Sequence, residues 1–213
     1  MAALEELYTR NPAKAKIFCD GEWGVDVDGL IFPNVRTAKL NVMELAKKFE
    51  RRAGMDFGYQ DPSCILETYR DEENKVIYVT NEFYKTGQTL EELLIAMRKM
   101  NLTKVKCWAD SAEPRSIDFF VHNDCRVVPC VKGQNSVQAR IAFLQNHQII
   151  IDESCVNTIN DFENFCYLKD RDGNFTDKTD HTFSHAVDAL GYAYSNIYTQ
   201  HKLRTLDKSI LGL

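Results

Sequence analysis

The chain has 213 residues, of which 44% are hydrophobic and 27% charged, and its formal net charge is −5. This composition is typical of one ordinary globular domain with or without an extension, and it argues against a protein that holds nucleic acid by overall positive charge. An acidic protein can still bind phosphates where basic residues are local and acidic residues gather around a cation.

Neither secretion nor a membrane location is predicted. The first residues, MAALEELYTR, are polar and contain no apolar signal core. No apolar run approaches the roughly 18 residues that a membrane-spanning helix needs. Seven cysteines are scattered without a CxxC pair, which is typical of reduced thiols in a cytoplasmic protein, most of them in the core.

Residues 1–50 differ in pattern from the rest of the chain. We expect a short helix before Asn11-Pro12, a hairpin in GEWGVDVDGLIFPN around Asp28-Gly29, and a helix from Val42 to Phe49. We therefore interpret residues 1–50 as an N-terminal extension and residues 51–213 as the main domain.

The main domain begins with three predicted strands, Ala53–Tyr59, Ser63–Tyr69 and Val76–Tyr84, which we expect to form an antiparallel meander. After the meander we expect helices at 89–100, 114–123, 136–146, 154–167 and 184–199 and strands at 104–110, 126–130 and 148–152. Crossover helices make the later strands parallel to the first. This order predicts an α/β protein of the ribonuclease H-like (integrase/resolvase) class, with a mixed sheet flanked by helices.

Three aspartates occupy positions where a lone charge is unusual. Asp56 lies in GMDFG, and the glycines on its side of the strand leave room for a positive partner. Asp110 ends the strand KVKCWAD, and Asp188 lies in the apolar helix SHAVDALGYAY with His185 one turn before it. The predicted topology allows the three carboxylates to converge.

Converging carboxylates repel one another and raise each other's pKa unless a cation neutralises them. Mg²⁺ or Mn²⁺ does so, because hard cations prefer oxygen ligands, and two such ions about 4 Å apart promote phosphodiester hydrolysis. We therefore expect Asp56, Asp110 and Asp188 to be catalytic metal ligands, with His185 as a ligand or a neighbour of the ligands. Taken singly, Asp56 could be a turn or edge residue, Asp110 a helix N-cap, Asp188 a buried salt-bridge partner and His185 a proton shuttle or packed core residue.

Basic residues near these motifs are candidates for contacts to phosphate groups. Lys132 and Arg140 lie around a glycine and a serine-capped helix, and Arg115, five residues after Asp110, is a weaker candidate. Ordinary solvated charges are the alternative reading of these side chains.

Two further polar segments lie near the acidic motifs in the sequence. Asp61, in QDPS, is expected to be a turn residue rather than an outer metal ligand. The loop from Lys169 to His181 has a hairpin tip at Asp172-Gly173, and its glycine is wrongly placed for an EF-hand. This loop either borders the cleft and limits access of duplex DNA or is a plain surface loop.

The segments GMDFGYQDPS, CWADSAEP and SHAVDALGYAY resemble the three acidic motifs of the nuclease domain of large terminase subunits, the DNA-packaging motors of tailed bacteriophages. GEWGVDVDGLIFPN resembles the segment after that family's ATPase domain, and VPCVKGQNSVQARIAFLQNHQIIID resembles its Lys-Gly stretch. The resemblance covers nearly the whole chain. Because the sequence contains no GxxxxGK[ST] phosphate loop, we expect the nuclease part without its ATPase domain. The family often has Asn or Asp in place of His185.

The resemblance implies a metal-dependent endonuclease that uses Mg²⁺ or Mn²⁺ to cut concatemeric double-stranded DNA with little sequence specificity during viral genome packaging. It also implies an ATPase domain, a small terminase subunit and a portal protein as partners, and the host cytoplasm as the location. Two alternatives stay open. One is another ribonuclease H-like nuclease, such as a junction resolvase, and the other is a catalytically silent DNA-binding or scaffold domain of the same fold.

Overall fold

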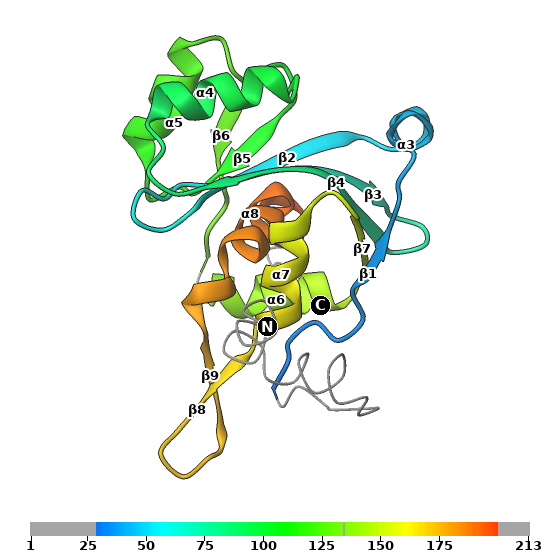
Figure 1. Ribbon diagram of the computed structural model, residues 1–213, viewed down its shortest axis with the longest axis vertical. Helices are drawn as coiled ribbons and strands as arrows, with labels where there is room; N and C mark the ends of the chain where they lie inside the picture. The colour runs from blue at the N-terminus through cyan, green and yellow to red at the C-terminus, as the bar shows by residue number, and fades with distance from the viewer. Residues whose placement is uncertain (1–28, 134, 200–213) are drawn as a thin grey trace, which may run out of the picture.

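The computed structural model describes residues 29–133 and 135–199, which form a seven-stranded sheet with helices on both faces (Figure 1). The strands are β1 (Arg36–Ala38), β2 (Arg51–Asp56), β3 (Ser63–Asp71), β4 (Val76–Lys85), β5 (Cys107–Ala109), β6 (Val127–Pro129) and β7 (Gln148–Asp152). Their order across the sheet is β1-β7-β4-β3-β2-β5-β6. In this sheet β3 runs antiparallel to both of its neighbours, and the other neighbouring strands pair in parallel.

The predicted meander followed by parallel strands is confirmed. β2, β3 and β4 pair in sequence, with one bulge between Glu67 and Thr68. The chain then crosses over through α4 (Leu90–Lys99), α5 (Pro114–His122) and α6 (Ser136–Gln145). Each crossover helix returns the chain to the starting end of the sheet, so β5, β6 and β7 run parallel to β2.

The helices form two layers around the sheet (Figure 1). α4 and α5 cover one face, where Leu93, Met97 and Phe120 pack with Met55 and Ile65. α6, α7 (Val156–Asn164) and α8 (His185–Ala193) cover the other face. Successive residues of a strand point to opposite faces, so Met55 faces α4 and α5, whereas Gly54 and Asp56 face α8.

Gly54 is the point at which α8 meets β2. A Cβ atom at Gly54 would lie 1.8 Å from the carbonyl oxygen of Ala189, so the helix backbone lies directly on the strand. The expectation that both glycines make room for a positive group beside Asp56 is therefore corrected. Gly58 belongs to the following turn, where its Cβ would meet the carbonyl oxygen of Asp61 at 2.5 Å.

Two predicted boundaries shift for local reasons. β2 ends at Asp56 rather than at Tyr59, because the chain turns at Gly58. The N–H of Gly58 donates to the Ser63 hydroxyl at 3.1 Å, and that hydroxyl donates to the Gly58 carbonyl at 2.6 Å. The helix predicted at 184–199 breaks at Tyr194, and helical backbone resumes at 195–199.

The helix predicted at 154–167 is also shorter, because α7 ends at Asn164. The chain then enters a hairpin of β8 (Tyr167–Lys169) and β9 (Phe175–Thr179), and a 3₁₀ turn, η1 (His181–Phe183), leads into α8. The hairpin has its tip at the predicted Asp172-Gly173, where the φ angle of Gly173 is 85°. Figure 1 shows the hairpin projecting away from the rest of the fold.

The segment before residue 51 adds one strand that the sequence did not indicate. β1 pairs in parallel with β7, and α3 (Val42–Lys48) follows it, capped by the side chain of Asn41. The short helix and most of the hairpin predicted near the start of the chain lie outside the described residues. No described helix is long and apolar enough to cross a membrane.

Replacing Gly54 with alanine is expected to destabilise the fold by about 1–3 kcal/mol, since the added methyl group would overlap the α8 backbone and overpacking has costs of that size. Urea or thermal unfolding measures the change. Gly133→Ala is the matched control, because nothing lies within 4 Å of a Cβ at Gly133. Equal unfolding midpoints for Gly54→Ala and wild type would show that α8 can move off β2 without cost.

Candidate active site

Two of the predicted acidic residues lie side by side at the carboxyl ends of neighbouring parallel strands. Asp56 is the last residue of β2, and Asp110 directly follows β5. Met55 pairs with Ala109, and the Asp110 N–H donates to the Met55 carbonyl at 3.3 Å. The carboxyl ends of parallel strands are the usual place for ligands in an α/β sheet.

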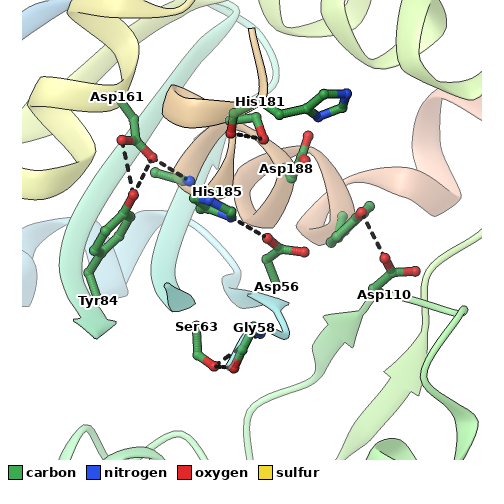
Figure 2. A network of polar contacts seen from close by, with 12 residues as sticks. Asp56, Gly58, Ser63, Tyr84, Asp110, Asp161, His181, His185 and Asp188 are labelled. Carbon is green, nitrogen blue, oxygen red and sulfur yellow. Dashed lines mark hydrogen bonds and ion pairs between the residues drawn. The ribbon is translucent and has the colours of Figure 1, made fainter. Parts of the chain in front are cut away.

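Helix α8 brings His185 and Asp188 to the same edge (Figure 2). The two residues are three positions apart, so their side chains lie on one face of the helix. His185 Nδ1 lies 3.2 Å from Asp56 Oδ2, and the imidazole ring meets the Tyr84 ring edge-on with 6.3 Å between centroids. The structure thus gathers the four residues that the sequence singled out.

Asp56 and His185 shift each other's protonation. Asp56 is 8% exposed, and this burial raises its pKa to about 6. The hydrogen bond with His185 opposes that rise, whereas the nearby charges of Asp188 and Asp110 add to it. The same hydrogen bond raises the pKa of His185, although partial burial of the ring acts against it. The imidazolium therefore remains paired with the carboxylate closer to neutral pH than a free histidine would allow.

Asp110 has the opposite electrostatic setting. Its Oδ1 accepts hydrogen bonds from Lys132 Nζ at 2.5 Å and from the Ala112 N–H at 2.8 Å, and its Oδ2 accepts the Tyr192 hydroxyl at 3.2 Å. Burial acts to raise the pKa of Asp110, but these three donors together hold it below its ordinary value. Asp110 is therefore the acid of the site that is most firmly kept ionised.

Asp188 forms an ion pair with Arg140 of α6. Burial raises the pKa of Asp188, and the Arg140 charge opposes the rise. The contact lacks hydrogen-bond geometry, so Asp188 Oδ1 has no hydrogen-bond donor among the described residues. Arg140 is only 7% exposed and lies across Gly191, where a Cβ atom would come within 1.9 Å of Arg140 Cδ. Arg140 is thus a buried side chain and not a solvated surface charge.

Tyr192 lies between the two ion pairs. Besides bonding Asp110, its ring has Lys132 Nζ at 5.5 Å and Arg140 Cζ at 5.6 Å from its centroid. A pocket of about 230 Å³ opens at this place, with Lys132, Arg140, His181 and Asp188 among its lining residues. The acidic edge of the sheet therefore borders a hollow that carries two cationic side chains.

The sequence reasoning missed Asp161. This residue of α7 is 1% exposed and accepts hydrogen bonds from the Tyr84 hydroxyl and from the N–H of Ala186 (Figure 2). Burial raises its pKa to about 6. Its position between Thr158 and Phe162 on the apolar face of a predicted helix was the available signal. Tyr192 and Gly191 belong to the same apolar motif as Asp188, and no pattern in that motif indicates their part in the site.

Two other predicted residues lie apart from the carboxylates. Arg115 is exposed in the first turn of α5 and forms no ion pair with a described residue. Asp61 is exposed in the turn between β2 and β3, as expected, and its charge contributes to the raised pKa of His185.

The chemical types of the donor atoms suit a hard divalent cation. The donor set consists of three carboxylates and one imidazole from three elements, although Asp188 Oδ1 is already paired with Arg140. In the part of the chain that is described, however, no group of three His, Cys, Asp or Glu side chains has the arrangement of a preformed metal site. Asp110 is turned toward Lys132 and Asp188 toward Arg140.

Comparisons with known proteins agree on one family. A family model described as "Terminase RNAseH like domain" matches residues 56–196. The chain is 31% identical over 156 residues to the large terminase subunit of Bacillus phage SPP1, covering 71% of this chain and 37% of that protein. It is 29% identical over 144 residues to the PBSX phage terminase large subunit of Bacillus subtilis strain 168, and the match covers 67% of this chain and 33% of that protein. The chain thus spans about a third of the length of these relatives.

Solved structures give the same result. The nuclease domain of the SPP1 large terminase, solved with bound Mn, matches with a TM-score of 0.71 and 29% identity, covering 78% of this chain and 97% of that domain. The nuclease domain of the P22 large terminase matches with a TM-score of 0.60 and 15% identity, and the match covers 79% of this chain and 92% of that domain. These matches confirm the predicted ribonuclease H-like fold.

Asp56→Asn and Asp110→Asn are expected to change stability in opposite directions in buffer with EDTA. Folding raises the pKa of Asp56 to about 6. Its ionisation therefore lowers the free energy of unfolding as the pH rises from the Asp56 pKa of the unfolded chain to about 6. Asp56→Asn should therefore melt above wild type at pH 7.5, and the gain should shrink as the pH falls below 6. The pKa of Asp110 is lowered by folding, so its charge stabilises the native state above the unfolded pKa. Asp110→Asn should melt below wild type at pH 7.5.

Calorimetric melting of both variants and wild type between pH 5 and 8 measures these shifts. The loss in Asp110→Asn should persist to pH 5, because its stabilising effect is lost only below the ordinary carboxyl range. Melting shifts of the same sign in both variants would contradict the assignment of the two electrostatic settings.

Proposed function

This chain belongs to the family of terminase RNase H-like domains, which confirms the resemblance found in its sequence, and from that premise we propose that it is the nuclease part of a bacteriophage DNA-packaging terminase. The proposed reaction is hydrolysis of phosphodiester bonds in double-stranded DNA with little sequence preference. The observation that supports it best is the gathering of Asp56, Asp110 and Asp188 at one sheet edge, with His185 bonded to Asp56.

Asp56, Asp110, Asp188 and His185 are the proposed ligands of Mg²⁺ or Mn²⁺, with two ions in the site. A divalent cation held there supplies positive charge to the attacking and leaving oxygens during hydrolysis. Carboxylates suit both ions, and the SPP1 nuclease domain, which is 29% identical to this chain over the aligned part, was solved with bound Mn.

The remaining residues orient these groups and meet the substrate. His185 donates to Asp56 and so fixes the orientation of that carboxylate, as the Tyr192 hydroxyl does for Asp110. Lys132 and Arg140 are the proposed contacts to DNA phosphates, since their cationic groups line the pocket beside the acids. Arg115, exposed on α5, is a weaker candidate for the same role.

The matched part of this chain covers only about a third of each relative, so the proposed partners follow from the family. They are an ATPase domain preceding an extension at residues 1–50, a small terminase subunit and a portal protein. The proposed place of action is the host cytoplasm.

The two alternatives make different predictions about substrate and metal. A junction resolvase should cut a four-way junction faster than a linear duplex of matched sequence, whereas a packaging nuclease should not. A catalytically silent scaffold need not bind Mn²⁺ at the acidic residues, which titration calorimetry detects.

Asp56→Ala, Asp110→Ala and Asp188→Ala are each expected to lower the cleavage of plasmid and linear duplex DNA by at least about 100-fold, the size of effect seen when one charge-stabilising group is removed from an active site. Each variant should remain folded, although Asp110→Ala and Asp188→Ala should melt below wild type because they leave Lys132 and the buried Arg140 without a carboxylate partner. Gel analysis of DNA cut with Mn²⁺ measures the rates, and circular dichroism checks the fold.

Asp118→Asn, an exposed change on α5, is the matched control and should cut as wild type does. Wild-type rates in any two of the three alanine variants would refute the assignment of the site. Sequenced product ends that share a short consensus would refute cleavage without sequence preference.

His185 is expected to favour Mn²⁺ over Mg²⁺, because an imidazole nitrogen is a softer ligand than a carboxylate oxygen. Replacing His185 with Asn or Asp, the residues frequent in the family at this position, should bring the two cleavage rates closer together. His185→Ala should lower the rate with both metals. The measurement is the ratio of the Mn²⁺ rate to the Mg²⁺ rate in wild type and the three variants, and an unchanged ratio would reject ligation by His185.

A further inference from the structure

The amino ends of α7 and α8 are capped by side chains from other elements. Cys155, the residue before α7, provides no side-chain cap. Instead, Glu82 of β4 accepts hydrogen bonds from the backbone and side-chain donors of Asn157 and Thr158, at distances between 2.6 and 3.0 Å. The first N–H groups of a helix lack partners within the helix and favour a negative charge, so Glu82 fastens α7 to β4.

Asp161 fastens α8 in the same way. Ser184, the residue before α8, gives the helix no side-chain cap, because its hydroxyl donates to the His181 carbonyl at 3.2 Å. Asp161 Oδ2 accepts the N–H of Ala186 at 2.9 Å, and the Tyr84 hydroxyl donates to both Asp161 oxygens at 3.1 and 3.2 Å (Figure 2). α8 is therefore anchored by α7, which is itself anchored by β4.

This series of contacts leads from β4 through α7 to His185. The N–H that Asp161 accepts belongs to the peptide that joins His185 to Ala186, so Asp161 holds the backbone of His185 directly. The His185 ring then lies between Tyr84, edge-on at 6.3 Å, and Asp56, whose Oδ2 is 3.2 Å from Nδ1. Glu82 and Tyr84 are two positions apart and lie on the same side of β4.

We propose that Asp161 is a positioning residue of the site, which holds the first turn of α8 and thereby fixes His185 and Asp188 relative to Asp56. The proposal rests on the proposed function, in which those side chains bind a divalent cation. Residues that orient metal ligands by hydrogen bonding have effects on metal affinity and activity that approach those of the ligands themselves.

Stability alone explains Asp161 poorly. It is 1% exposed and forms no ion pair with a described residue. A buried carboxylate without an ion-pair partner costs free energy, and the raised pKa of Asp161 shows that the hydrogen bonds from Tyr84 and Ala186 and the nearby His185 charge recover only part of that cost. What the carboxylate contributes is a fixed position and direction for the start of α8.

The test compares Asp161→Asn with Glu82→Gln. Both substitutions remove the charge of a carboxylate that caps a helix from outside and leave the size of the side chain unchanged, but only Asp161 contacts α8. The primary measurement is the NMR signal of the His185 Cε1–H group in protein labelled with ¹³C-histidine, in EDTA and at the upper plateau of its pH titration, where loss of the Asp161 charge cannot act through protonation of the ring. The signal is assigned with His185→Gln. The second measurement is calorimetric titration with Mn²⁺.

Asp161→Asn should shift the His185 signal and weaken Mn²⁺ binding by about 10- to 100-fold. Glu82→Gln should lower the melting temperature and should change the His185 signal and the Mn²⁺ affinity much less than Asp161→Asn does, because Glu82 contacts α7 and not α8. If the two variants have equal effects on His185 and on Mn²⁺, or if neither has any, Asp161 is only a structural cap and the proposal is overturned.

The outcomes also separate this proposal from the proposed function. If wild type binds no Mn²⁺ but Asp161→Asn alone shifts the His185 signal, Asp161 positions His185 and the metal function fails. If Asp161→Asn does not fold, Tyr84→Phe replaces it, since it removes one donor to Asp161 and retains the ring beside His185. The same comparison with Glu82→Gln then decides the question.

Discussion

The site depends on how closely α8 approaches β2. At Gly54 the helix carbonyl of Ala189 occupies the space that any side chain would need. Since residues alternate along a strand, Gly54 and Asp56 share one face, so the strand that accepts the helix also presents the first carboxylate to it. The helix arrives with His185 and Asp188 on the turn that meets Asp56. A bulkier residue at position 54 would separate these acids, even though it would lie outside the site itself.

The charges of the site are balanced one by one, which is how a protein of net charge −5 can hold three converging carboxylates. Asp56 meets an imidazole, Asp110 a lysine and Asp188 a buried arginine. A second glycine makes the last pairing possible, because Arg140 lies over Gly191 where a side chain would collide with it. The three partners differ in exposure and hydrogen bonding, so the pKa values of Asp56 and Asp110 move in opposite directions.

Local patterns in the sequence predicted the strand order and the converging acids well. Alternation predicted strands at β2 to β7, and the crossover rule made those after the meander parallel to the first, which allowed Asp110 to be a neighbour of Asp56. What the sequence could not reveal depends on contacts between distant segments. β1 has three residues and is a strand only because β7 lies beside it. Asp161 acts across helices, and the glycine at position 54 accommodates a helix backbone that is more than 130 residues later in the chain.

The nine residues of α8 are too few to form a stable helix alone, since isolated helices shorter than about 12 residues are marginal in water. The helix is also interrupted at Tyr194, and Ser184, which precedes its first turn, provides no side-chain cap. Its position must come from the strand beneath it and from the carboxylate of α7 at its amino end. The motif SHAVDALGYAY therefore identifies which residues can act, whereas β2, β4 and α7 determine where they act.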